Sequence, residues 1–135
     1  MIYIDTSVFL RILLNQPNRL SFKSAVRLVS SELFKMELNR TLDRLRLESK
    51  LDDATLGDAK EESKIFLENV ELVKLTSGIK QRVNESFPTV VGTLDGLHLA
   101  TALALREKKY PALKIASHDV QIIRCARTLG FEVLH

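Results

Sequence analysis

The sequence predicts an α/β fold, with a mainly parallel sheet of about five strands covered by helices on both faces. Short apolar segments rich in β-forming residues alternate with longer segments of helical periodicity. The 135 residues suffice for a hydrophobic core, and we expect one domain over residues 1–135. The one cysteine, Cys125, excludes an internal disulfide framework and a cysteine-rich zinc site. It lies among apolar helical residues and is expected to be buried.

The first half of the chain is expected to open on a strand. Residues 2–4 are short, apolar and β-rich, which is typical of a buried strand. The polar residues that follow cap a helix over 8–14, and residues 25–30 form a second candidate strand. Serines at the end of that strand cap a long helix whose apolar residues recur at steps of four and three. A further helix, roughly 53–69, follows.

The second half repeats the alternation. Residues 70–75 alternate apolar and polar side chains and predict a third strand, and a short helix follows over 77–87. Thr93 is expected to cap a helix from residue 94 to about 108. The remaining elements are a strand at 113–116, a helix at 120–129 closed by Gly130, and a strand at 131–134.

The net charge of +3 is unevenly spread along the chain. Residues 1–50 carry +4, residues 51–71 carry −5, and residues 72–135 carry +4. The basic segments permit a polyanionic partner without indicating one by themselves. No apolar run approaches the ~20 residues of a membrane span, and the first residues lack the basic region of a secretory signal. We therefore expect a cytoplasmic protein with no membrane contact.

Acidic residues stand at two of the predicted strand ends. Asp5 ends the first strand and Asp119 follows the fourth, at the edge where parallel sheets bind ligands. Asp95 lies in the first turn of a later helix, and Glu37 flanks the apolar stripe of the long helix. Each has a plain structural explanation: an N-cap at the junctions, compensation of the helix dipole in the first turn, or an ion pair of Glu37 with Arg40. If the four converge, their repulsion demands a cation, and carboxylates without Cys or His neighbours favour Mg²⁺ or Mn²⁺.

Four segments, in order along the chain, resemble the motifs of PIN-domain nucleases. They are residues 2–7 (IYIDTS), residues 30–38 with Arg40, residues 93–103 (TLDGLHLATAL), and residues 116–119 followed by 125–127 and Gly130. The resemblance covers nearly the whole chain. Within the family, a domain of this length is similar to the VapC toxins of toxin–antitoxin pairs.

This resemblance implies a three-layer α/β/α fold and a Mg²⁺- or Mn²⁺-dependent endoribonuclease that acts as the toxin of a type II toxin–antitoxin pair. It implies an RNA substrate, a cognate antitoxin and a homodimer. The catalytic and metal-binding residues carried over by position are Asp5, Glu37, Asp95 and Asp119. The supporting residues are the hydroxyls of Thr6, Ser7 and Ser117 and the basic Arg40. The chain departs from the family in the short stretch 17–25, where relatives commonly fit a further helix.

Two other classes of function remain open. A non-catalytic PIN-like binding module would share the fold, but intact acids at all four positions argue against it. A phospho-accepting α/β signalling domain also places carboxylates at strand ends. It requires a lysine at a later strand end, where this chain has Ser117-His118-Asp119.

Two further features have a structural and a functional interpretation. His98 lies three residues after Asp95 on the same helix face, and we expect it to be structural or exposed rather than a metal ligand. The basic residues of the long helix form either an RNA-contacting ridge or a solvated face. They are Arg40, Arg44, Arg46 and Lys50.

Overall fold

The computed structural model describes residues 1–23 and 25–135, and within them the sheet has five parallel strands in the order β3-β2-β1-β4-β5. The strands are β1 (Ile2–Ile4), β2 (Leu28–Ser31), β3 (Val70–Val73), β4 (Lys114–Ala116) and β5 (Val133–Leu134). The helices are α1 (Thr6–Leu13), α2 (Leu33–Leu47), α3 (Asp53–Leu67), α4 (Ser77–Val83), α5 (Thr93–Lys108) and α6 (Val120–Thr128). The predicted α/β class is confirmed.

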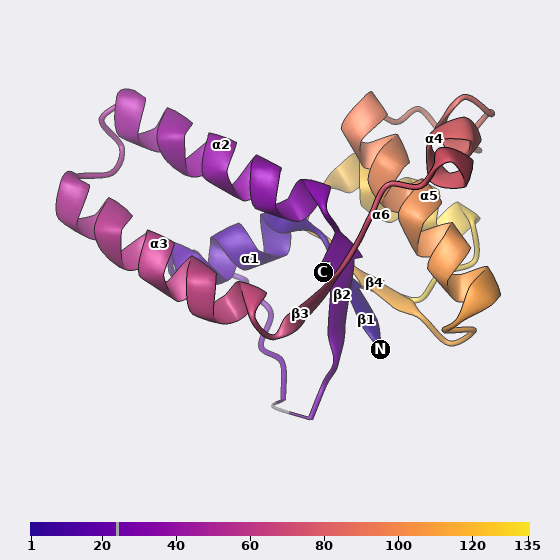
Figure 1. Cartoon of the computed structure of the whole chain (residues 1–135), viewed down its shortest axis with the longest axis horizontal. Helices are drawn as coiled ribbons and strands as arrows, with labels where there is room; N and C mark the ends of the chain where they lie inside the picture. Colours follow the sequence, from indigo (N-terminus) through magenta and orange to yellow (C-terminus); the bar gives the residue numbers. More distant parts are fainter. Residues whose placement is uncertain (24) are drawn as a thin grey trace.

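Helices cover both faces of the sheet, as the alternation of elements predicts. In Figure 1, α1, α2 and α3 lie on one side of the strands, and α4, α5 and α6 lie on the other. Because side chains alternate along a strand, Ile2 and Ile4 pack towards the first layer, and Tyr3 packs towards the second. Phe9 and Phe34 belong to the first core, and Cys125 is buried in the second, as the sequence indicates.

The predicted element boundaries are wrong at several places. The first helix begins at Thr6, because Asp5 has extended backbone (φ −84°, ψ 152°) and is the N-cap. The second strand begins at Leu28, which pairs with Ile2, so that residues before it lie beyond the start of the neighbouring strand. The short helix α4 stops at Val83 instead of continuing to residue 87.

Two predicted helix caps are also replaced. The N-cap of α5 is Gly92, whose extended backbone leaves Thr93 as the first helical residue. The N-cap of α2 is Glu32, although Ser31 Oγ still accepts a hydrogen bond from the Leu33 N–H at 3.2 Å. A serine hydroxyl therefore satisfies one free N–H of this helix from outside the N-cap position.

The strand order reverses direction at the first strand. The chain passes from β1 to β2 and β3 on one side, and then crosses to β4 and β5 on the other. Ligands of open α/β sheets bind at such a reversal, outside the carboxyl ends of the strands. At this edge the Asp5 N–H donates a hydrogen bond to the Ala116 carbonyl at 3.0 Å, which joins the ends of β1 and β4. In the described part of the chain, no helix has the length and apolar character required to cross a membrane.

Candidate functional site

Asp5 lies buried at the carboxyl end of β1, beside the end of β4. It is the N-cap residue of α1, but its side chain makes no capping hydrogen bond. Its Oδ2 instead accepts hydrogen bonds from Ser7 Oγ and from Ser117 Oγ, the latter at 2.9 Å. The N-cap explanation therefore accounts for the backbone of Asp5 and not for its carboxylate.

Glu37 reaches the same edge of the sheet from α2. Its Oε2 accepts a hydrogen bond from Thr6 Oγ1 at 2.6 Å and contacts His98 Nε2 at 2.8 Å. Burial acts to raise the pKa of Glu37, but the hydrogen bonds and charge of His98 and the Thr6 hydroxyl outweigh it, so that the pKa is lowered. Glu37 is thus held as a carboxylate in a half-buried place.

Arg40, predicted to support the site, points elsewhere. Its guanidinium pairs with Asp43 at 3.2 Å on the exposed side of α2. The alternative explanation of Glu37, an ion pair with Arg40, is not realised either. Among the predicted supporting residues, the hydroxyls of Thr6, Ser7 and Ser117 contact the carboxylates of Asp5 or Glu37.

Asp95 stands in the first turn of α5 and is half-buried. Burial and the nearby carboxylates of Asp119 and Asp5 raise its pKa, against a hydrogen bond from the Gly92 backbone and the charge of His98. The three acids are therefore close enough to repel one another.

Asp119 is the one acid of the four whose predicted cap is present. Its Oδ1 accepts from the backbone N–H of Gln121 at 2.7 Å and of Ile122 at 3.1 Å, at the start of α6. Both of these bonds fall on one oxygen of the carboxylate. Asp119 thus caps α6, and its charge also contributes to the raised pKa of Asp95.

A possible ion-binding group combines side chains from three elements. Three ligand atoms lie within 4.8 Å of one another, one from each of Asp5, Glu37 and His98. His98 is buried in α5, so the sequence expectation of a structural residue fits its burial, and the expectation of exposure does not. Its contact with Glu37 was missed because the two are 61 positions apart. The available signal was the spacing of three residues from Asp95, which places both on one face of the helix.

The protonation of His98 depends on its acidic neighbours. Burial opposes the charged imidazolium, but the hydrogen bond to Glu37 and the carboxylates of Asp5 and Asp95 raise the pKa of His98 above its ordinary value. At the reversal of strand order, the structure thus brings Asp5 and Glu37 together with one buried imidazole. Asp95 and Asp119 lie outside this group, although the charges of Asp5 and Asp119 affect the pKa of Asp95.

Comparisons with known proteins bear on the family and the fold of the chain. Residues 2–128 match the family model of the PIN domain. The chain belongs to the PIN-domain family. A solved structure, "Crystal structure of VapBC2 from Rickettsia felis bound to a DNA fragment from their promoter", aligns to this PIN domain with a TM-score of 0.66 and 16% sequence identity. The alignment covers 99% of this chain and 98% of that chain, and at this identity it shows a shared fold. No curated protein matches the sequence significantly.

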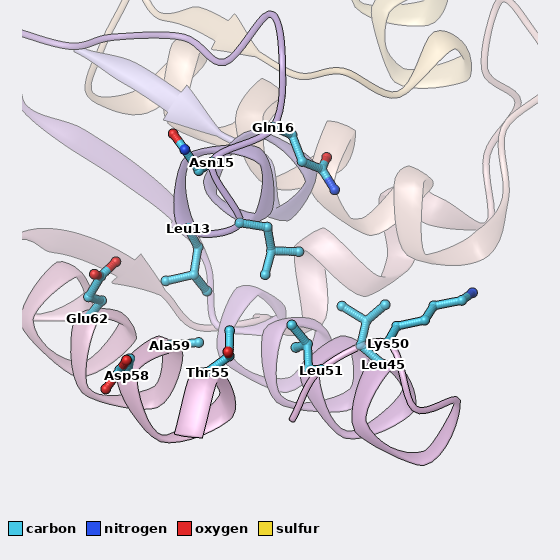
Figure 2. Close-up of a pocket in the computed structure, with 11 residues that line it drawn as sticks. Leu13, Asn15, Gln16, Leu45, Lys50, Leu51, Thr55, Asp58, Ala59 and Glu62 are labelled. Carbon is cyan, nitrogen blue, oxygen red and sulfur yellow. The ribbon is translucent and has the colours of Figure 1, made fainter. Parts of the chain in front are cut away.

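A separate pocket of about 490 Å³ lies away from the carboxylates of this PIN domain. Figure 2 shows Leu13, at the end of α1, across the pocket from Ala59 of α3 and from Leu51, which lies between α2 and α3. Asp58 and Glu62 add acidic side chains from α3, and Lys50 adds a basic one. The pocket is thus an apolar hollow with a charged rim.

Proposed function

We propose that this PIN domain is a divalent-metal-dependent endoribonuclease and the toxin of a type II toxin–antitoxin pair in the cytoplasm. The observation that carries the proposal is the approach of Asp5 and Glu37, from two different elements, to within 4.8 Å at the strand-order reversal. Family membership supports a nuclease, and the fold shared with a VapBC2 structure supports a toxin.

The donor set fits a hard cation. Carboxylate oxygens are the ligands that Mg²⁺ and Mn²⁺ prefer, and burial together with the nearby charges of Asp119 and Asp5 raises the pKa of Asp95. Asp5, Glu37, Asp95 and Asp119 would hold the ion. When bound, it supplies Lewis acidity at the scissile phosphate and lowers the pKa of a coordinated water.

The protein's own groups would prepare the carboxylates for this task. Ser7 and Ser117 hold one oxygen of Asp5, and Thr6 holds one oxygen of Glu37, so both carboxylates are oriented before substrate arrives. Preorganised groups need no rearrangement during the reaction, which is why such contacts favour catalysis. The exposed basic residues of α2, Arg40 and Arg44, would contact RNA phosphates.

A cleavage assay tests the reaction class. We expect the wild type to cut structured RNA with Mg²⁺ or Mn²⁺, to be inactive in EDTA, and to leave single-stranded DNA of the same sequence intact. Readdition of Mn²⁺ to the EDTA sample should restore cleavage. RNA cleavage that is equal in EDTA, or no cleavage of any RNA with either ion, would contradict the proposal.

The proposed partner is an antitoxin encoded beside this chain. Its tail would place a basic side chain among the carboxylates, because the acids at this edge of the sheet attract a cation. The apolar pocket of Figure 2 offers a second contact surface, suited to the apolar face of a helix. We also propose a homodimer.

Co-expression with the product of the neighbouring gene tests these partners. The two proteins should co-purify, and sedimentation of the PIN domain alone should give the mass of a dimer. The complex should cleave RNA more slowly than the free domain. A strict monomer with no stable partner would exclude both assemblies.

A further inference from the structure

Three side chains form a hydrogen-bonded row that ends on Glu37. Tyr3 Oη lies 2.8 Å from His98 Nδ1, and His98 Nε2 lies 2.8 Å from Glu37 Oε2. Tyr3 and His98 are 1% and 2% exposed, so water does not compete for these contacts. The row starts on β1, passes through α5, and reaches α2 on the opposite side of the sheet. It therefore links one carboxylate of the site to both helical layers.

The chemistry of the atoms determines which atom donates the hydrogen bond to Glu37. A carboxylate oxygen only accepts, so His98 Nε2 must carry the hydrogen in its contact with Glu37. In a neutral imidazole the other nitrogen, Nδ1, is then an acceptor, and the Tyr3 O–H donates to it; in the imidazolium Nδ1 donates to Tyr3 Oη instead, and Nε2 donates to Glu37 in both forms.

A nitrogen that carries a hydrogen has no free lone pair. His98 Nε2 is therefore a donor to Glu37 in this arrangement and is not available as a metal ligand, although it lies close enough to Asp5 and Glu37 to suggest one. Histidines and carboxylates around metal ions are commonly oriented by such outer partners, and removing a partner costs about 10–100-fold in metal affinity or activity.

We propose that Tyr3 and His98 are positioning residues that orient the Glu37 carboxylate for the ion. Tyr3 fixes the tautomer of His98, and the Nε2–H of His98, together with the Thr6 hydroxyl, holds Glu37 Oε2. The carboxylate is thereby kept near Asp5 instead of turning to solvent. This inference rests on the proposed function, because it assigns Glu37 to the metal site.

Tyr3→Phe is the decisive variant, because it removes one hydroxyl and keeps the ring that packs edge-on against His98 with centroids 5.9 Å apart. Tyr110→Phe is its matched control: the Tyr110 hydroxyl also donates to a glutamate, Glu71 at 3.0 Å, away from the four acids. Each variant and the wild type are titrated with Mn²⁺ by calorimetry. We expect Tyr3→Phe to weaken Mn²⁺ binding about tenfold and Tyr110→Phe to leave it unchanged.

A spectroscopic readout separates positioning from simple packing. Nitrogen-15 spectra of the histidine rings, assigned by comparison with His98→Gln, should show the Nε2–H form of His98 in the wild type and a loss of that preference in Tyr3→Phe. The His98→Gln variant should also retain part of the Mn²⁺ affinity that His98→Leu loses, since the glutamine amide supplies an N–H donor to Glu37.

The outcomes distinguish this inference from the proposed function. If the wild type binds Mn²⁺ and Tyr3→Phe binds it equally well, the positioning role is overturned and the proposed function stands. A protonated Nδ1 with a bare Nε2 in the wild type would also overturn it. If the wild type binds neither Mn²⁺ nor Mg²⁺, the proposed function fails and the inference fails with it.

Discussion

Asp5→Asn is expected to remove nearly all RNA cleavage while leaving the fold intact. Asparagine has the shape of aspartate and can still accept a hydrogen bond from Ser117, but it lacks the charge that holds a hard cation. Losing such a contact at a phosphoryl-transfer site costs several kcal/mol, which is a factor of about a hundred or more at ~1.4 kcal/mol per tenfold change. The measurement is the rate of RNA cleavage with saturating Mn²⁺, alongside the melting temperature of each protein.

Arg44→Ala provides the comparison, because Arg44 is an exposed basic residue of α2. A phosphate contact on a helix face contributes affinity for RNA more than it contributes to the chemical step. We therefore expect Arg44→Ala to raise the RNA concentration needed for half-maximal cleavage and to change the maximal rate little. Equal rates for wild type and Asp5→Asn would mean that the charge of Asp5 does not hold a catalytic ion.

The sequence predicts the location of the site better than the boundaries of the elements. Asp5 and Asp119 could be placed at one sheet edge because parallel strands share their carboxyl ends, and the structure has both beside the reversal between β1 and β4. The start of β2 could not be predicted, since it depends on which residue faces Ile2 across the sheet. The ends of strands depend on pairing partners that are distant in sequence, and local propensity does not reflect these partners.

The contacts of each acid could not be predicted from the sequence for the same reason. The Glu37–Arg40 pair follows from helical spacing, but Arg40 pairs with Asp43 at the same spacing on the exposed side. Glu37 contacts His98 instead, through the packing of α2 near α5 at the edge of the sheet. Helical spacing predicts which side chains share a face, and tertiary packing decides which of them meet.

Mn²⁺ is expected to raise the melting temperature of the wild type by several degrees, and Asp95→Asn to lose most of that rise. Burial of the Asp95 carboxylate and its repulsion by Asp119 and Asp5 destabilise the apo protein, as the raised pKa of Asp95 indicates. An ion that binds the folded state alone stabilises it by about 2.7 kcal/mol at a hundred times its dissociation constant. The Asp95→Asn variant lacks one of the charges that attract this ion.

The pH dependence of the apo protein predicts whether Asp95→Asn is more or less stable than the wild type. Because the pKa of Asp95 is raised in the folded state, its protonated form favours folding below the ordinary value of 3.8, and this contribution is lost as pH rises through the raised pKa. Without metal, Asp95→Asn should therefore be at least as stable as the wild type at pH 7.5. With millimolar Mn²⁺ the order should reverse.

Asp58→Asn is the matched control for this experiment, because it removes the same charge from an exposed position on α3. Thermal unfolding of the three proteins, with EDTA and with Mn²⁺, gives the six melting temperatures that are needed. Asp58→Asn should follow the wild type under both conditions, since Asp58 is exposed on α3 and is not one of the four acids proposed to hold the ion. No rise with Mn²⁺ in the wild type, or an equal rise in Asp95→Asn, would show that charge repulsion at this edge of the sheet is not relieved by an ion that Asp95 helps to hold.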